Sequence, residues 1–392
     1  MADLALLGGP PVRPALLPYA RQTIEADDTA AVVEALGGAW ITQGPAVARF
    51  EAALAAALGA RHAVAVASGT AALHAAYWAA GLGAGDDVVT TPLTFAATAN
   101  ALVALGARPV FADIDPDTLD LDPAAVKRVA TPGTRAVVPV DFAGLPCDYA
   151  GLAALARDHG WTLIADAAHS LGGGHGGRPV GSLADMTTLS FYPAKQITSG
   201  EGGAVLTGDA ALAERLRRVR HHGIGYADPA RPWRYDIEQP GGNYRLTDFQ
   251  AALGTSQLGK LARFHAARER LARRYRERLA GVPEIALPAL PDDRRHGWHL
   301  FVVLLRLERL IADRDTVLRA LRAENVGATM HYPLVYRHRF YRERFGYGPG
   351  LCPVADDVER RLVTLPLYPS MTDRDQDDVF EALDKVLRHF AR

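Results

Sequence analysis

One lysine stands in a turn made mostly of small and polar residues. Lys195 lies within Ser190–Gly203, between the apolar run Met186–Phe191 and a second run at Ala204–Thr207. Both runs read as buried strands, and lysine is rarely buried unless it is paired or has a chemical task. A desolvated lysine loses its proton readily, and the neutral amine can form a Schiff base with an aldehyde. Taken alone, a solvated loop lysine is the simpler interpretation, so other motifs must decide.

A second motif, Ser68-Gly69-Thr70, joins an expected strand to an expected helix. A glycine-containing turn at a helix N-terminus presents several N–H groups and the positive end of the helix dipole, which favours a phosphate. Ser and Thr are also ordinary helix N-caps, so the tripeptide is a weak signal by itself.

Asp166 ends the apolar strand in Thr162–His169. A carboxylate at a strand end could hold a protonated pyridine nitrogen of a bound cofactor, or it could cap the next turn. His169 follows three residues later and could lie near the same ring, although it could also be structural. Phe95 could cover a face of a planar heterocycle, with a place in the core as the alternative.

Asn243-Tyr244-Arg245 offers an amide, a phenol and a guanidinium together, which suits the binding of an anion.

Two other kinds of motif, for dinucleotides and for metals, do not support a binding site. Gly172–Gly177 fits GxGxxG, but Arg178-Pro179 opens no helix, which argues against a dinucleotide-binding fingerprint. The 13 histidines form neither HExxH nor paired Cys/His spacing, so we predict no metal site.

The elements that would position these residues alternate along the chain. Short Val/Ala/Ile-rich runs and helices predict an α/β fold, a mostly parallel sheet with helices on both faces and ligands at the carboxyl ends of the strands. We expect strands at 62–67, 87–91, 108–112, 135–140 and 162–165, and helices at 27–36, 45–58, 71–82, 96–105, 149–159 and 210–222.

The second half begins with a long loop, 223–243, of the kind that often has a function. One long helix is expected over 246–279, and then the pattern restarts with strands ending at 307 and 331 and helices at 315–324 and 373–389. We therefore predict three parts: an N-terminal arm at 1–22, a large domain at 23–250, and a small α+β domain at 251–392 that begins with the long helix.

Composition and net charge limit the classes of partner that the protein could bind. The 392 residues carry 43 Lys+Arg against 44 Asp+Glu, a net charge of −1 that gives no general reason to bind nucleic acid or an anionic membrane. No apolar run reaches the ~18 residues of a membrane span, and the start lacks signal-peptide features. The two cysteines form no CxxC pair, as expected of a cytoplasmic protein.

Together, four segments resemble the DegT/DnrJ/EryC1/StrS family of sugar aminotransferases, which are pyridoxal-phosphate enzymes of the aspartate-aminotransferase fold (fold type I). The segments occur in the family's order, and the likeness runs from Trp40–Pro45 to Leu365–Leu367. They are Ser68–Thr70, Asp166–His169, Ser190–Gly203 and Asn243–Asp248.

The resemblance implies a role for each motif. Lys195 would carry the cofactor as an internal aldimine, with pyridoxamine phosphate formed in the cycle, and would move the proton. Asp166 would pair with the pyridine nitrogen, and His169 would lie near the ring hydroxyl. Phe95 would stack on the ring. The phosphate would be held by Gly69, Thr70, Ser190 and Asn243. Asn243 would come from the other subunit of a homodimer with shared active sites.

The C-terminal segments Met330–Tyr336 and Phe340-Tyr341 look most like the pseudaminic-acid branch. That branch implies amination at C4 of a UDP-4-keto-6-deoxy-N-acetylhexosamine, with L-glutamate as the amino donor. Many relatives have histidine where this chain has Tyr192, which leaves the substrate contacts open. Residues expected toward the sugar nucleotide are Tyr19, Trp40, Ile41, Thr42, Tyr192, Met330, His331 and Tyr332.

Four alternatives stay open at this point. A different sugar (dTDP- or GDP-linked, or a 3-keto sugar) would keep the same chemistry. A dehydratase of the family would typically replace the lysine with histidine, so Lys195 argues against it. An enzyme acting on small amino acids would need a carboxylate clamp that the sequence does not reveal. The last is a non-catalytic sugar-nucleotide-binding regulator.

Overall fold

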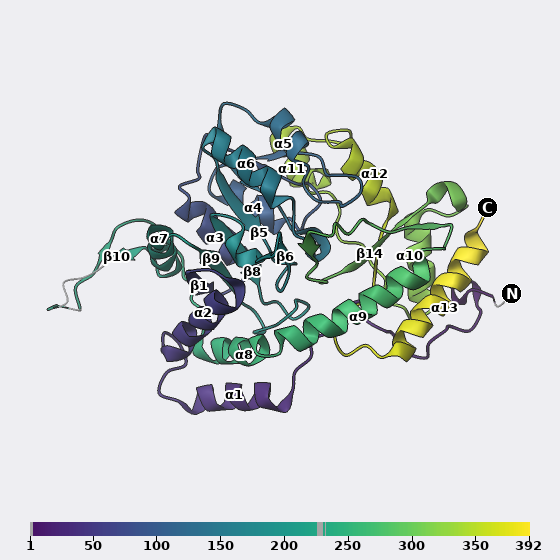
Figure 1. Cartoon of the computed structure of the whole chain (residues 1–392), viewed down its shortest axis with the longest axis horizontal. Helices are drawn as coiled ribbons and strands as arrows, with labels where there is room; N and C mark the ends of the chain where they lie inside the picture. The colour runs from purple at the N-terminus through teal and green to yellow at the C-terminus, as the bar shows by residue number, and fades with distance from the viewer. Residues whose placement is uncertain (1–2, 226–229, 232) are drawn as a thin grey trace.

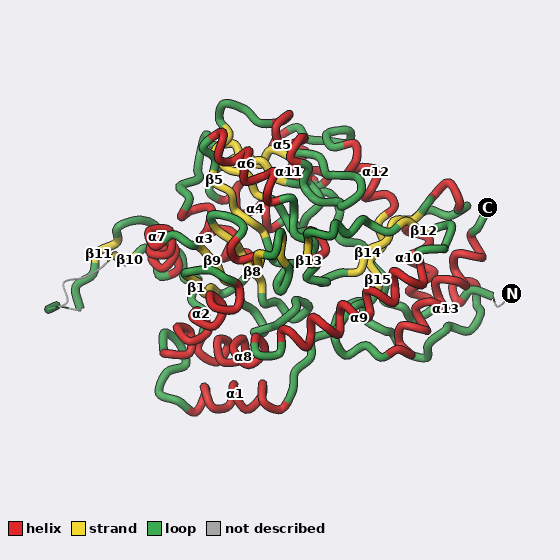
Figure 2. Tube along the Cα trace, viewed as in Figure 1, coloured by secondary structure: helices red, strands yellow, loops and turns green. Residues whose placement is uncertain are grey.

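A computed structural model describes residues 3–225, 230–231 and 233–392. Its centre is a seven-stranded sheet, whose strands are among those coloured yellow in Figure 2. The predicted loop 223–243 and the predicted N-terminal arm fall partly outside the described residues. In order across the sheet, the strands are β1 (His62–Val66), β9 (Gly203–Thr207), β8 (Met186–Ser190), β5 (Thr162–Asp166), β4 (Thr134–Val138), β2 (Asp87–Thr90) and β3 (Arg108–Phe111).

The sheet is mostly parallel, as the sequence predicts. Strands β8, β5, β4, β2 and β3 run parallel to one another, whereas β9 is antiparallel to both β8 and β1. Because both faces are covered, these strands consist of nearly continuous apolar runs. In β1, for example, Val64 and Val66 pack on one face, and Ala63 and Ala65 pack on the other.

Helices cover both faces of this sheet (Figure 1). One face packs against α3 (Gly69–Ala79), α4 (Ala97–Ala104) and α7 (Ala210–Arg220). The other face packs against α2 (Pro45–Leu58), α5 (Pro123–Val129), α6 (Tyr149–His159) and α8 (Asp248–Leu258). Helix α1 (Ala26–Gly37) lies outside α2 and α8 and contacts α8.

The expected single helix over 246–279 is wrong. It is two helices, α8 and α9 (Leu261–Leu279), separated at Gly259-Lys260. Lys260 turns its ammonium to Glu25, Asp27 and Asp28 at distances of 2.6–3.2 Å, so the break ties the start of α1 to this point. From there α9 runs to the C-terminal part of the molecule (Figure 1).

The C-terminal part has its own sheet, with strand order β12 (Ile285–Ala286), β14 (Phe301–Leu305) and β15 (Leu362–Leu365), all antiparallel. Helices α10 (Arg314–Ala323), α13 (Asp373–Phe390) and α9 share its core, which Leu4 and Leu17 of the N-terminal segment join. Helices α11 (Arg339–Phe345) and α12 (Pro353–Arg361) pack between the two sheets.

The expected strand ending at His331 is also wrong. Thr329 makes only an isolated bridge with Thr364, after which His331 and Tyr332 leave the sheet and line a cavity instead. Short strands complete the fold: β6 (Gly174–His175), β7 (Arg178–Pro179) and β13 (Arg294–Arg295) pair with one another, and β10 (Ile224–Gly225) pairs with β11 (Asp236–Ile237). Among the helices of the described residues, none has the length and apolar character needed to cross a membrane.

Candidate active site

A cavity of about 460 Å³ opens at the carboxyl ends of the central strands, where an open α/β sheet binds its ligands. It collects residues from the strand ends, from the N-termini of α3 and α4, and from the C-terminal part. Eleven of the predicted site residues line it: Tyr19, Gly69, Thr70, Phe95, Asp166, His169, Ser190, Tyr192, Lys195, His331 and Tyr332.

The turn before α3 forms one wall. Ser68 caps the helix by accepting a hydrogen bond from the Ala71 N–H at 3.1 Å. A β-carbon on Gly69 would lie 2.8 Å from the β-carbon of Ser190, so only glycine lets the end of β8 approach so closely. The first N–H groups of α3 and the Thr70 and Ser190 hydroxyls thus border one space that suits an anion.

Asp166 lies deeper, at the end of β5, and its side chain is buried. One carboxylate oxygen accepts a hydrogen bond from the Thr98 hydroxyl at 2.7 Å, and the other accepts from the Ala168 N–H at 3.2 Å. Burial raises the pKa of Asp166, and these two donors together with the charge of Lys195 oppose that effect. A cationic partner bound in the cavity would therefore stabilise this carboxylate.

Lys195 lies in the turn after β8, where its N–H bonds the Tyr192 carbonyl at 2.9 Å. The surrounding protein removes water from the ammonium and lowers the Lys195 pKa to about 8, and the charge of Asp166 only partly offsets this. A substantial fraction of the amine is therefore neutral near physiological pH, which a nucleophilic lysine requires.

His169 is buried between two other rings. Its Nε2 lies 3.1 Å from the Tyr332 hydroxyl, and its ring centre lies 4.4 Å from that of His299. Burial lowers the His169 pKa well below its usual value, so the imidazole is neutral. Its Nδ1 is buried and has no hydrogen-bond partner among the described residues, so it can bond a molecule in the cavity.

Aromatic residues form the mouth of the cavity. Phe95 is 60% exposed, and Tyr192 is 48% exposed. Tyr19 packs against His331 with ring centres 5.0 Å apart, and Phe95 lies 5.9 Å from Tyr332. These rings leave an apolar face open to a planar or sugar-like ligand.

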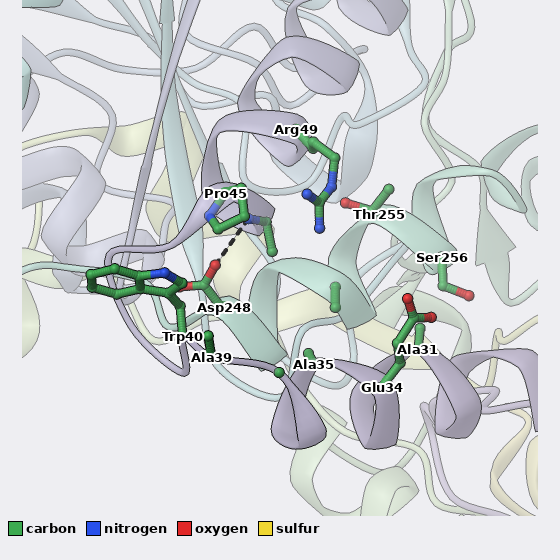
Figure 3. Close-up of a pocket in the computed structure, with 13 residues that line it drawn as sticks. Ala31, Glu34, Ala35, Ala39, Trp40, Pro45, Arg49, Asp248, Thr255 and Ser256 are labelled. Atoms are coloured by element: carbon green, nitrogen blue, oxygen red, sulfur yellow. Dashed lines mark hydrogen bonds between the residues drawn. The ribbon is translucent and has the colours of Figure 1, made fainter.

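Five predicted residues lie away from this cavity within the described chain. Trp40 borders a separate pocket of about 500 Å³ between α1, α2 and α8, where Figure 3 shows it beside Ala39 and Asp248. Thr42 bridges Thr247, and Asn243 bridges His221. The remaining two are Ile41, which is 53% exposed, and Met330, which contacts Arg314.

The sequence reading missed several cavity residues. Thr94 and Thr98 flank Phe95 on the approach to α4, Glu201 follows Lys195 in the same turn, and His299 comes from the segment before β14. Thr98 could have been predicted from its spacing, because it lies three residues after Phe95 and therefore on the same side of the chain at the start of α4. His299 could not have been, because its place depends on how the C-terminal part folds back.

A lysine of low pKa, a buried carboxylate and a helix N-terminus around one cavity, on a mostly parallel sheet, define a pyridoxal-phosphate transferase of fold type I. Comparison with known protein families and structures specifies which kind of transferase it is. The model of the DegT/DnrJ/EryC1/StrS aminotransferase family matches residues 22–384, and the chain belongs to that family. It is a pyridoxal-phosphate-dependent sugar aminotransferase.

Three similar proteins illustrate the family. The spore coat polysaccharide biosynthesis protein SpsC of Bacillus subtilis is 41% identical over 95% of this chain and 97% of its own. Helicobacter pylori PseC, an aminotransferase involved in the biosynthesis of pseudoaminic acid, is 29% identical with a TM-score of 0.90 over 96% of this chain and all of its own. DesI, solved with its TDP-sugar product, is 34% identical with a TM-score of 0.88 over 98% of this chain and 96% of its own.

The cavity fits the family's cofactor. Gly69 leaves open a space that a β-carbon would fill, beside the N-terminus of α3. Among the described residues, the His169 Nδ1 lacks a hydrogen-bond partner, and the Asp166 carboxylate is hydrogen-bonded by the Thr98 hydroxyl and the Ala168 N–H rather than by a cation. A phosphate, a ring oxygen and a protonated ring nitrogen would satisfy these three features in turn.

Proposed function

We propose that this enzyme transfers an amino group from an amino acid, L-glutamate, to C4 of a UDP-linked 4-keto-6-deoxy-N-acetylhexosamine. The observation that carries the amino-transfer part is the presence of Lys195 and Asp166 in one cavity, with the lysine pKa lowered to about 8. The structural similarity to PseC supports the choice of sugar. We also propose that the enzyme is located in the cytoplasm.

Each residue has a proposed task. Lys195 attaches the cofactor as a neutral amine and, once released, would move a proton from the donor α-carbon to the cofactor carbon that receives the amino group. Asp166 holds the ring nitrogen in its protonated form, and His169 bonds the ring oxygen through Nδ1. Bound pyridoxal phosphate would supply an electron-withdrawing ring and a carbonyl carbon that accepts the amino group. Gly69, Thr70 and Ser190 hold its phosphate, and Phe95 covers one face of its ring.

The outer part of the cavity would receive the sugar. Tyr19, Tyr192 and His331 line it above the lysine. Burial lowers the His331 pKa to about 4, so this imidazole is neutral and can donate or accept a hydrogen bond without binding the acidic donor as a cation. Stacking of a pyranose on Tyr19 and hydrogen bonds from the Tyr192 hydroxyl are the proposed contacts.

A different nucleotide sugar is the second candidate. DesI has a TDP-sugar product, and its structure is about as similar to this chain as that of PseC. Tyr192 stands where many relatives have histidine, which favours a substrate contact that differs from theirs. A panel of UDP-, dTDP- and GDP-linked 4-keto and 3-keto sugars, tested for amination by the pyridoxamine form, decides between the candidates.

A homodimer with shared active sites would explain the residues that lie away from the cavity. Asn243 does not line the cavity of its own chain. None of the described residues that line this cavity would offer a side-chain amide to the proposed phosphate. Trp40 and Ile41 expose large apolar side chains, 61% and 53%. We propose that this surface faces a second copy, which donates Asn243.

Within one chain, we propose a division into three parts: the arm at 1–22, the large domain at 23–250 and the small domain at 251–392.

The decisive experiment uses purified protein loaded with pyridoxal phosphate. L-Glutamate should bleach the visible absorption, and the correct keto-sugar should restore it with formation of an amino sugar. Lys195→Ala should stop turnover, while Lys127→Ala, an exposed lysine on α5, should not. Visible absorption that glutamate does not bleach would contradict L-glutamate as the amino donor. Bleaching with no return on any keto-sugar would contradict the sugar acceptor.

A further inference from the structure

The environment of Asp166 contains a hydroxyl with no assigned task. Thr98 comes from the first turn of α4 and is 1% exposed. Its Oγ1 lies 2.7 Å from Oδ2 of Asp166, although the two residues are 68 positions apart in the chain. The other carboxylate oxygen receives only a longer bond from the Ala168 N–H, at 3.2 Å. Thr98 is therefore the closest donor to this carboxylate among the described residues.

The direction of this hydrogen bond follows from counting protons. The Thr98 oxygen lies near three acceptors: Asp166 at 2.7 Å, the Thr94 hydroxyl at 2.9 Å and the Phe95 carbonyl at 3.3 Å. A hydroxyl has one proton, and a carboxylate is the strongest of these acceptors. Thr98 therefore donates to Asp166, and Thr94 is free to donate to Thr98. The result is a chain of hydroxyls that ends on the carboxylate.

Thr98 is also held firmly in place. The hydroxyl of Tyr77, a fully buried residue of α3, donates to the Thr98 carbonyl at 3.1 Å. The Thr98 N–H bonds the Phe95 carbonyl at 3.3 Å. The same short segment thus places Phe95 at the cavity mouth and the Thr98 hydroxyl on Asp166, so its position is fixed before any ligand binds.

We propose that Thr98 is a positioning residue of the reaction. Its hydroxyl fixes the orientation of the Asp166 carboxylate and stabilises the negative charge there, so that the ring nitrogen of the bound cofactor keeps its proton. This inference rests on the proposed role of Asp166 and adds the group through which the fold controls that role.

The electrostatic reasoning includes the other groups that face Asp166. Lys195 is the nearby positive charge, while Tyr77, Tyr332 and Asp141 are the other titratable groups coupled to this carboxylate. Burial raises the pKa values of all three, so at neutral pH the two tyrosines are neutral. Loss of the Thr98 donor would make Asp166 more basic, and the shared proton would move from the ring nitrogen toward the carboxylate. A less positive ring would raise the pKa of the imine nitrogen that would join it to Lys195.

The test compares Thr98→Val, which keeps the shape and removes the hydroxyl, with Thr98→Ser, which keeps the hydroxyl. Two measurements are made on protein reconstituted with pyridoxal phosphate: the dissociation constant of the cofactor and the pH midpoint of its visible absorption band. We expect Thr98→Val to weaken cofactor binding on the order of tenfold and to raise the midpoint by about 0.5–1 pH unit. Thr98→Ser should stay close to the original protein in both.

Two further variants separate the possible causes. Thr90→Val removes another buried threonine hydroxyl, which donates to the Val138 carbonyl at 2.7 Å outside the cavity, and should change neither measurement. Asp166→Asn should change both by more than Thr98→Val does. If Thr98→Val does not fold, Thr98→Ala takes its place against Thr98→Ser.

The outcomes are distinct. Values for Thr98→Val equal to those of the original protein, with Asp166→Asn shifted, would overturn the role of Thr98 and leave that of Asp166 intact. Values for Asp166→Asn equal to those of the original protein would overturn the proposed role of Asp166, and the inference about Thr98 with it. Equal shifts in Thr98→Val and Thr90→Val would show a general packing effect and would also overturn the inference.

Discussion

Gly69 and Ser190 meet at the N-terminus of α3, so closely that a β-carbon on Gly69 would lie 2.8 Å from that of Ser190 and 3.0 Å from its hydroxyl oxygen. The contact joins the first turn of a helix to the end of a strand more than a hundred residues later in the chain. It closes the space that we propose for the cofactor phosphate, and its tightness can be tested.

Gly69→Ala should weaken the binding of pyridoxal phosphate by about tenfold or more, because the new methyl group must displace Ser190 or the N–H groups of α3. Ser190→Ala, which removes one hydroxyl and adds no bulk, should weaken it less. Gly208→Ala is the control, since a β-carbon there meets open space. Equal affinities for Gly69→Ala and Gly208→Ala would show that the phosphate binds elsewhere.

The lowered pKa of Lys195 predicts a stability effect in the cofactor-free protein. The pKa is about 8 in the folded state against an ordinary 10.5, so folding opposes protonation of this amine. Between those two values the unfolded chain holds a proton that the folded chain has lost, and stability therefore rises with pH across this window. Below pH 8 both states are protonated, and the full cost of the buried ammonium remains.

Lys195→Met removes that cost. At pH 7 the variant should unfold with a free energy about 1–3 kcal/mol greater than that of the original protein, and the difference should shrink as the pH approaches 10.5. Denaturant unfolding at several pH values measures it. Lys127→Met, at an exposed position on α5, should show no such pH-dependent difference. A gap that does not change with pH would point to packing rather than to the charge.

The Tyr332 hydroxyl is expected to set the tautomer of His169. With a neutral imidazole, a hydroxyl that donates to Nε2 at 3.1 Å leaves the proton on Nδ1, the atom without a partner among the described residues. Tyr332→Phe frees the ring to adopt either tautomer. We expect kcat/KM for amino transfer to fall about tenfold.

Tyr341→Phe serves as the matched control for that variant. Its hydroxyl donates to the Asn100 side-chain oxygen at 2.6 Å, away from the cavity, so it removes a similar bond without affecting His169. An equal fall in kcat/KM for both phenylalanine variants would argue against a role in tautomer selection.

The sequence predicts the sheet well because its strands are apolar on both faces, and that pattern does not depend on distant contacts. It cannot predict the direction of β9, because an apolar run such as Ala204–Thr207 is the same in a parallel and an antiparallel strand. It also hides the break at Gly259, where the apolar spacing continues and only the ion pairs of Lys260 reveal the turn. Of the helices not expected, α5 does begin with a readable signal: Asp122 at the N-cap, which accepts from the Ala124 and Ala125 N–H groups, followed by Pro123 in the first turn.

The same distinction holds for the cavity. Lys195 and Asp166 can be found because each is a charged residue next to an apolar strand and because the other motifs of the family accompany them in order. His299 cannot, because histidine is common and only the fold brings this residue to His169. The spacing from Phe95 could place Thr98 near the cavity, but only the fold shows that its hydroxyl reaches Asp166. The resemblance placed Trp40 at the sugar nucleotide and Asn243 at the phosphate of the other subunit, and their position outside the cavity makes the proposed second subunit necessary to those roles.

Arg268 supplies a last prediction, about how the C-terminal part is held against the site. Its guanidinium is buried and donates to the carbonyls of Leu367 at 2.9 Å and of Trp298 and His299 at 3.3 Å. Burial lowers its pKa only to about 10, so it stays charged at neutral pH. These bonds join α9 to the backbone of His299, the residue that packs on His169.

Arg268→Met keeps most of the side-chain volume but leaves three carbonyls without their donor. It should lower the free energy of unfolding by about 2–4 kcal/mol, measured by denaturant titration. Arg263→Met on the same helix breaks an exposed ion pair with Glu25 and a cation–π contact with Phe264, and its effect should be much smaller, below about 1 kcal/mol. Equal stability of the two variants would contradict this account. Because His299 would also lose its anchor, we expect Arg268→Met to weaken cofactor binding even at temperatures where it remains folded, whereas Arg263→Met should not.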